Sequence, residues 1–164
     1  MISPMNTSSQ SEIESRGFII DRIALPQSIR QNVLNRDWSE LDRGIRIEAN
    51  PGGVIFEKLL EYGHFTTIEF IISIRSSFEF PDEDGIWHDD GSRKFAFSLS
   101  LTLEPEQVVG GVLEIRPKGA DASHRIPTPK FGKMIVFATG QTGYEHKINR
   151  VSEGERIIIA GWCT

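Results

Sequence analysis

The chain has 164 residues, of which 38% are hydrophobic and 25% are charged. This length predicts one domain, and the composition is typical of a folded globular protein. The net charge of −5 argues against a nucleic-acid partner. The sequence contains no run of 18 apolar residues, so we expect no membrane span. Its single cysteine, Cys163, excludes an intrachain disulfide and suits the cytoplasm, where we expect the protein to reside.

The N-terminal third of the chain is predicted to carry the helices. Residues 1–15 are polar and rich in serine, which predicts a flexible tail before a single domain over residues 16–164. Residues 17–20 predict a short strand. Residues 26–34 begin with a proline and place their apolar side chains on one side, so they predict a helix.

Two further segments before residue 86 are assigned from weaker patterns. Alternating residues at 43–48 favour a strand. In residues 66–76, Thr66 or Thr67 could serve as an N-cap, which favours a helix over a strand.

From residue 86 onward the pattern changes to strands. Residues 95–103 alternate at period two, with phenylalanine and leucine on one face and small or hydroxyl side chains on the other. Further strands are predicted at residues 112–115, 133–138, 144–151 and 156–163. The turn residues 152–155 predict that the last two strands form a hairpin. Helices followed by antiparallel strands indicate a mainly β fold, a jelly roll with one or two N-terminal supporting helices and a site at its mouth.

Three side chains are candidates for a metal site. His88 and Asp90 are two residues apart, so in a strand both would point to the same face. The pattern His-x-Asp is common, and a surface loop explains it equally well. His146 is the natural third ligand, although a lone histidine is more often a core or surface residue. Two imidazoles and one carboxylate would leave open positions on a non-haem Fe(II) ion.

Arg156 opens an apolar strand, Arg-Ile-Ile-Ile-Ala-Gly-Trp, in which both faces are hydrophobic. Such a strand is expected to be buried on both sides, and a buried guanidinium needs a fixed anion. A bound carboxylate would satisfy it. A salt bridge to a distant acidic residue or a solvent-exposed strand end would do so too.

Taken together, these residues resemble a known family. The ordered pattern is similar to that of the prolyl-4-hydroxylase-like branch of the Fe(II)/2-oxoglutarate dioxygenases. The resemblance covers residues 86–163. The positions that carry it are His88, Asp90, His146, Val151, Gly154, Arg156 and Trp162.

The resemblance implies a double-stranded β-helix that binds Fe(II) through His88, Asp90 and His146 and uses 2-oxoglutarate and O2. It implies hydroxylation of a substrate with release of succinate and CO2. Arg156 would pair with the distal carboxylate of 2-oxoglutarate, where many members have lysine. Members often carry a tyrosine just upstream of His-x-Asp, which this chain lacks. Ser98 or Ser100 would then supply the second cosubstrate contact, and Trp162 would line the pocket.

The substrate is not specified by these residues. A peptidyl proline and a small molecule both suit the resemblance, and no signal defines an oligomeric state. Two other interpretations stay open on the residues alone. One is a cupin-like metal enzyme that does not use 2-oxoglutarate, and the other is a non-catalytic jelly-roll binding module.

Overall fold

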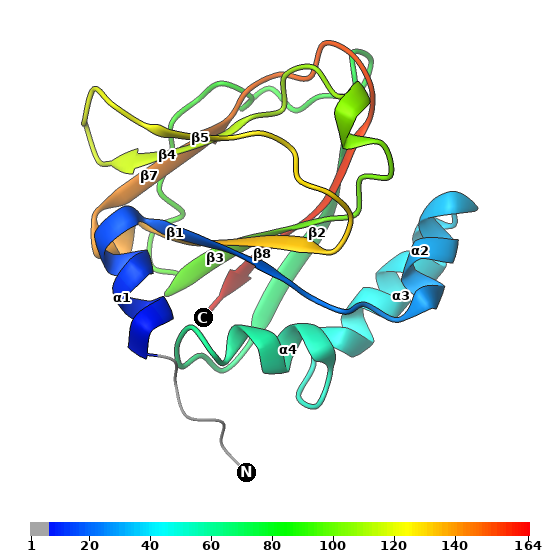
Figure 1. Ribbon diagram of the computed structural model, residues 1–164, viewed down its shortest axis with the longest axis horizontal. Helices are drawn as coiled ribbons and strands as arrows, with labels where there is room; N and C mark the ends of the chain where they lie inside the picture. Colours follow the sequence, from blue (N-terminus) through cyan, green and yellow to red (C-terminus); the bar gives the residue numbers. More distant parts are fainter. Residues whose placement is uncertain (1–6) are drawn as a thin grey trace.

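Two antiparallel sheets face each other in the computed structural model, which describes residues 7–164 (Figure 1). The large sheet has the strand order β1-β6-β3-β8-β2, and the small sheet has the order β5-β4-β7. The strands are β1 (Phe18–Arg22), β2 (Ile68–Arg75), β3 (Phe95–Ser100), β4 (Leu113–Pro117), β5 (His124–Ile126), β6 (Lys133–Ala138), β7 (Tyr144–Ile148) and β8 (Arg156–Cys163). This arrangement confirms the predicted jelly roll.

Four α-helices precede or interrupt the first strands, rather than the one or two that the sequence predicts. They are α1 (Thr7–Arg16), α2 (Gln27–Leu34), α3 (Trp38–Glu48) and α4 (Val54–Leu59). Helices α2 to α4 lie on the side of the large sheet that faces away from the small sheet (Figure 1). Two short 3-10 helices follow, at Pro105–Gln107 and Gly140–Thr142. Among residues 7–164, no helix is both long and apolar enough to cross a membrane.

Alternation along the strands gives the large sheet two different faces. On the helix side, Phe95 of β3 packs edge-on against Phe65, whose ring in turn contacts Phe56 of α4. Leu99 and Ile159, which are register partners on β3 and β8, are fully buried. The opposite residues of the same strands therefore point toward the small sheet, and they enclose the space between the two sheets.

The helix predicted for residues 66–76 is wrong, because this segment forms β2. All eight residues of β2 pair with β8. Ile68, Phe70, Ile72 and Ile74 alternate with polar or exposed residues, and β-branched side chains favour a pleated surface. This pairing outweighs the weak capping signal of the preceding threonines, whose hydroxyl groups instead contact Thr164.

Two other local predictions also need correction. Residues 43–48 belong to α3 rather than to a strand: Asp37 accepts a hydrogen bond from the Glu40 amide, and Leu41 and Ile45, four residues apart, are fully buried. Residues 7–15 of the predicted flexible tail form most of α1, where Ile13 joins the core. Residues 1–6 of that predicted tail lie outside the described residues.

The predicted hairpin between the last two strands is also wrong. β7 belongs to the small sheet and β8 to the large sheet, so the turn between them carries the chain from one sheet to the other. His146 and Arg156 still face the space between the two sheets, His146 from the small sheet and Arg156 from the large sheet.

The outer surface of the small sheet holds a polar network around Glu114 on β4. Its carboxylate accepts hydrogen bonds from Ser123 and Asn149 and forms ion pairs with Arg125 and Lys147. Burial raises the pKa of Glu114, but these hydrogen bonds and charges lower it further, to about 2. The folded protein therefore favours the ionised carboxylate more than the unfolded chain does.

This network predicts a pH-dependent effect of Glu114→Gln. At pH 7 the free energy of unfolding should fall by about 1–3 kcal/mol, because a hydrogen-bonded charge is lost. The contribution of Glu114 is complete above its unfolded pKa, near 4.3, and is lost as the pH falls toward 2. Urea unfolding from pH 7 to pH 3 should show the wild type and the variant converging. A difference that stays constant over this range would contradict the assignment.

Candidate metal centre and cosubstrate pocket

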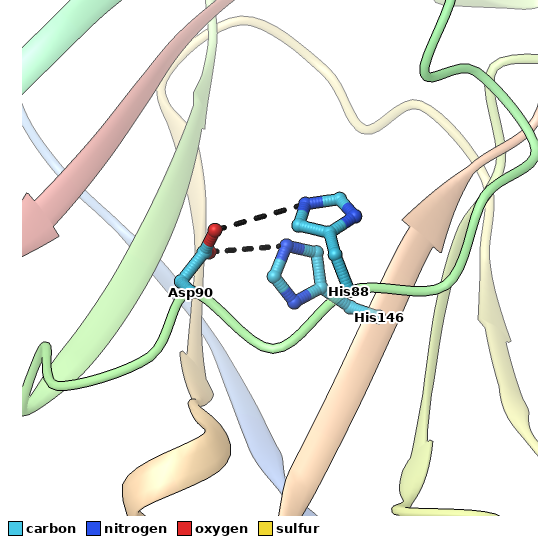
Figure 2. Close-up of side chains that lie close together, drawn as sticks. All are labelled: His88, Asp90 and His146. Carbon is cyan, nitrogen blue, oxygen red and sulfur yellow. Dashed lines mark ion pairs between the residues drawn. The ribbon is translucent and has the colours of Figure 1, made fainter.

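Three side chains converge between the sheets: His88, Asp90 and His146 (Figure 2). One ligand atom from each can be chosen so that all lie within 4.8 Å of one another. The Nε2 atom of His146 lies 3.2 Å from Asp90 Oδ2, and the Nε2 atom of His88 lies 3.7 Å from Asp90 Oδ1. The described residues therefore bring together the three ligands that the sequence predicts.

The local backbone around His88 and Asp90 differs from the strand considered in the sequence analysis. His88 does not lie in a named strand; it pairs with His146 of β7 through an isolated bridge, with backbone hydrogen bonds of 2.9 and 2.8 Å. Asp90 follows in a turn with φ of 57°. Aspartate tolerates this left-handed region better than most residues do. Asp89 points away from this cluster and pairs with Lys118 at 2.6 Å.

The protonation states suit metal binding. The Nδ1 atom of His88 lies 3.1 Å from the carbonyl oxygen of Ile86, which fits an Nδ1–H donor and leaves the Nε2 lone pair free. Burial raises the pKa of Asp90, but hydrogen bonding with His146 and Trp162 lowers it more. The net pKa lies below the usual value, so Asp90 is an anion at neutral pH.

The donor set fits a divalent ion of the first transition series. Ligand atoms about 2.1 Å from one ion and at right angles to each other lie about 3 Å apart. The distance of 3.2 Å from His146 to the Asp90 carboxylate is close to this separation, and the distance of 3.7 Å from His88 is longer. Two imidazoles and one carboxylate on one face would leave the opposite face of an octahedral ion open.

A cavity adjoins the three ligands and lies between the two sheets. The small sheet contributes Leu113, His146 and Ile148, and the large sheet contributes alternate residues of its strands. On the large sheet these are Ile71, Ser73 and Arg75 of β2, Ser98 of β3, and Ile158, Ala160 and Trp162 of β8. Phe97, Phe137 and Gly161 of the same sheet also reach the cavity.

Arg156 begins β8 on the same face as the cavity-lining residues Ile158, Ala160 and Trp162, but it does not itself line the cavity. Its side chain is only 1% exposed, and among the described residues its Nε and Nη1 atoms have no hydrogen-bond partner. Burial and the nearby Arg75 cation lower the pKa of Arg156 to about 9, whereas Asp84 opposes this shift. The guanidinium therefore stays cationic at neutral pH, and the charge lacks the fixed anion that the sequence analysis expects.

A sequence model of the 2OG-Fe(II) oxygenase superfamily matches residues 79–164, which include all three metal-ligand candidates and Arg156. The chain belongs to this superfamily. Its members use Fe(II), 2-oxoglutarate and O2, so the protein is a 2-oxoglutarate-dependent dioxygenase. The cupin-like enzyme and the non-catalytic binding module are therefore set aside. No curated protein matches the sequence.

Solved structures show that the fold is that of the prolyl-4-hydroxylase-like branch. A Pseudomonas putida prolyl-4-hydroxylase is 17% identical, with a TM-score of 0.60 over 98% of this chain and 94% of the other. A Trichoplax adhaerens prolyl hydroxylase, in complex with a peptide of the hypoxia inducible factor oxygen degradation domain, is also 17% identical. Its TM-score is 0.61 over 94% of this chain and 86% of the other.

Of the other residues predicted to contact 2-oxoglutarate, Ser98 and Trp162 line the cavity and Ser100 does not. The hydroxyl of Ser98 is buried in the cavity wall and has no hydrogen-bond partner among residues 7–164, so it is free for a ligand. The Ser100 hydroxyl is already used, since it donates to the Pro129 carbonyl at 2.7 Å, and it is not part of the wall. Trp162 lines the cavity beside Asp90. The roles of Ser98 and Trp162 in binding stay predictions.

Arg75 is the site residue that the sequence analysis missed. It lies on the cavity wall, directly opposite Arg156 in the pairing of β2 with β8. The signal was present, because Ile71, Ser73 and Arg75 recur at period two. A helix over residues 66–76 would instead distribute these three side chains around its axis, so a helical prediction does not place Arg75 on the cavity wall.

Gly111, just before β4, leaves the space that Arg156 occupies. Its φ is 65°, and an added Cβ would lie 2.7 Å from Cδ of Arg156 and 2.9 Å from Cγ2 of Val151. Gly111→Ala should therefore displace the guanidinium and weaken 2-oxoglutarate binding by about 10-fold or more. Titration of 2-oxoglutarate into the Mn(II)-loaded protein without O2 would measure this effect.

Gly119→Ala is the matched control for the backbone cost. Gly119 has a φ of 77° and no atom within 4 Å of an added Cβ. Both variants should lose about 1–2 kcal/mol of stability from the left-handed backbone. Only Gly111→Ala should also lose cosubstrate affinity, and equal affinities in the two variants would contradict the role of Gly111.

Proposed function

We propose that the protein hydroxylates a C–H bond of its substrate and converts 2-oxoglutarate and O2 to succinate and CO2. One oxygen atom would enter the substrate and the other would enter succinate. The observation that carries this proposal is the convergence of His88, Asp90 and His146 beside a cavity. The unpaired buried charge of Arg156 lies on the same face of β8 as three residues of the cavity wall.

In this proposal, one group of residues binds the metal and Arg156 binds the cosubstrate. His88, Asp90 and His146 would hold Fe(II), which supplies the oxidative chemistry when bound. Arg156 would hold the distal carboxylate of 2-oxoglutarate and so direct its keto acid end toward the three ligands. The apolar side chains of Leu113, Ile148 and others in the cavity wall would limit access of water.

A peptidyl proline is the first substrate to test, because the Trichoplax adhaerens enzyme was solved with a peptide and this chain shares its fold. A small molecule is the other substrate class. The test is incubation with Fe(II), 2-oxoglutarate, O2 and a pool of proline-containing peptides or of small metabolites. Mass spectrometry should find a product heavier by one oxygen atom, with succinate formed in equal amount. Failure to form succinate with either pool would count against the proposal.

A further inference from the structure

The wall of the cavity presents an arginine that neither the family pattern nor the sequence analysis singles out. Arg75 is the last residue of β2, and its Cα partner is Arg156, the first residue of β8. Side chains directly opposite in an antiparallel pair project from the same face, about 5 Å apart. Arg75 is 8% exposed and lines the cavity, whereas Arg156 does not line it and lies close to Gly111.

Arg75 is held in place by two neighbours. Its Nε donates to Asp84 Oδ1 at 2.9 Å, and its Nη1 contacts the hydroxyl of Ser73. The side chains of Arg75 and Asp84 are 10% and 4% exposed, so this ion pair is shielded from water. Within residues 7–164, no hydrogen bond uses Nη2 of Arg75, which leaves this donor group for a ligand.

The three buried charges of this cluster do not balance. Arg75 and Arg156 carry two positive charges and Asp84 carries one negative charge. Among the described residues, the Oδ2 atom of Asp84 and the Nε and Nη1 atoms of Arg156 have no hydrogen-bond partner. Glu83 also lines the cavity, but it is exposed and does not belong to this buried cluster. Burying an uncompensated charge is costly, and one carboxylate would make the buried cluster neutral.

We propose that Arg75 and Arg156 together form a two-arginine seat for the distal carboxylate of 2-oxoglutarate, with Asp84 as the positioning residue for Arg75. This inference rests on the proposed function and adds a determinant of specificity to it. The seat accepts one negative charge, so it selects 2-oxo acids that carry a second carboxylate over those that end in a methyl group.

The competing explanation is that Arg75 only anchors a loop. Asp84 belongs to the segment that leads from β2 to His88, and the neighbouring Gly85 amide donates to the Ile148 carbonyl at 2.7 Å. If anchoring were the whole role, losing Arg75 would disturb His88 and metal binding first. Every 2-oxo acid would then lose affinity to the same extent.

The experiment compares two ligands that differ only at the distal end. 2-Oxoglutarate and 2-oxopentanoate are titrated calorimetrically, without O2, into the Mn(II)-loaded wild type and into Arg75→Met. The variant should bind 2-oxoglutarate roughly 10- to 100-fold more weakly and 2-oxopentanoate with little change. Its Mn(II) affinity, measured by electron paramagnetic resonance, should stay within about threefold of the wild type. Arg43→Met, which removes an exposed arginine of α3, is the matched control and should change neither ligand.

The outcomes separate this inference from the proposed function. An unchanged preference for 2-oxoglutarate in Arg75→Met, or an equal loss for both ligands, would overturn the two-arginine seat. A wild type that shows no preference would instead count against the proposed function. If Arg75→Met does not fold, Arg75→Lys provides the test. Lysine keeps the charge but lacks the planar guanidinium, so this variant should retain only part of the preference for 2-oxoglutarate over 2-oxopentanoate. A full preference would overturn the two-arginine seat.

Discussion

His146→Ala is expected to abolish both turnover and metal binding. The Nε2 atom of His146 lies 3.2 Å from Asp90 Oδ2, and its ring is 5% exposed and packs against Phe137 and His88. Alanine would remove one of the three proposed protein ligands. Loss of a partner that merely supports a ligand costs roughly 10- to 100-fold in metal affinity, so loss of the ligand itself should cost more.

The measurement is an anaerobic titration of Fe(II) or Mn(II), combined with an assay of succinate formation. His64→Ala is the control, because His64 is exposed and does not belong to the cluster of metal-ligand candidates. It should leave metal affinity and turnover unchanged. A His146→Ala variant that keeps wild-type turnover would exclude the proposed metal site.

The metal-ligand candidates could be predicted from the sequence because residue type and order carry most of the information. Two imidazoles and a carboxylate define a chemistry wherever the fold brings them together, and the spacing from His146 to Arg156 matches a known family pattern. The local path could not be predicted. His88 and Asp90 converge through a bridge and a left-handed turn, which depend on pairing with β7, a segment more than fifty residues away.

The errors in the fold share a physical cause. Residues 66–76 and 43–48 were assigned from local signals, and tertiary contacts reversed both assignments. Ile72 is in a strand because β8 pairs with it at Ile159, and Ile45 is in a helix because an apolar stripe four residues apart meets the core. The assignment of β2 as a helix also hid Arg75. An error in secondary structure thus became an error in the site.

Arg156→Ala is the variant expected to weaken cosubstrate binding most while sparing the metal. The distal carboxylate of 2-oxoglutarate would lose a charge-assisted pair in a site shielded from water. Such a loss costs about 2–5 kcal/mol, which corresponds to a complex roughly 30- to 5000-fold weaker. Titration of 2-oxoglutarate into the Fe(II)-loaded protein without O2 would measure it. The removed side chain packs against Gly111 rather than against the metal ligands, so metal affinity should change little.

Arg156→Lys separates charge from geometry at the same position. Lysine keeps the positive charge but offers a single ammonium group. Arg156→Lys should therefore lose less affinity for 2-oxoglutarate than Arg156→Ala does. Arg43→Ala, which removes an exposed arginine paired with Glu40, should have no effect on cosubstrate binding. Unchanged affinity in Arg156→Ala would rule out the cosubstrate role of this residue. Such a result would also overturn the two-arginine seat, because the seat requires both Arg75 and Arg156.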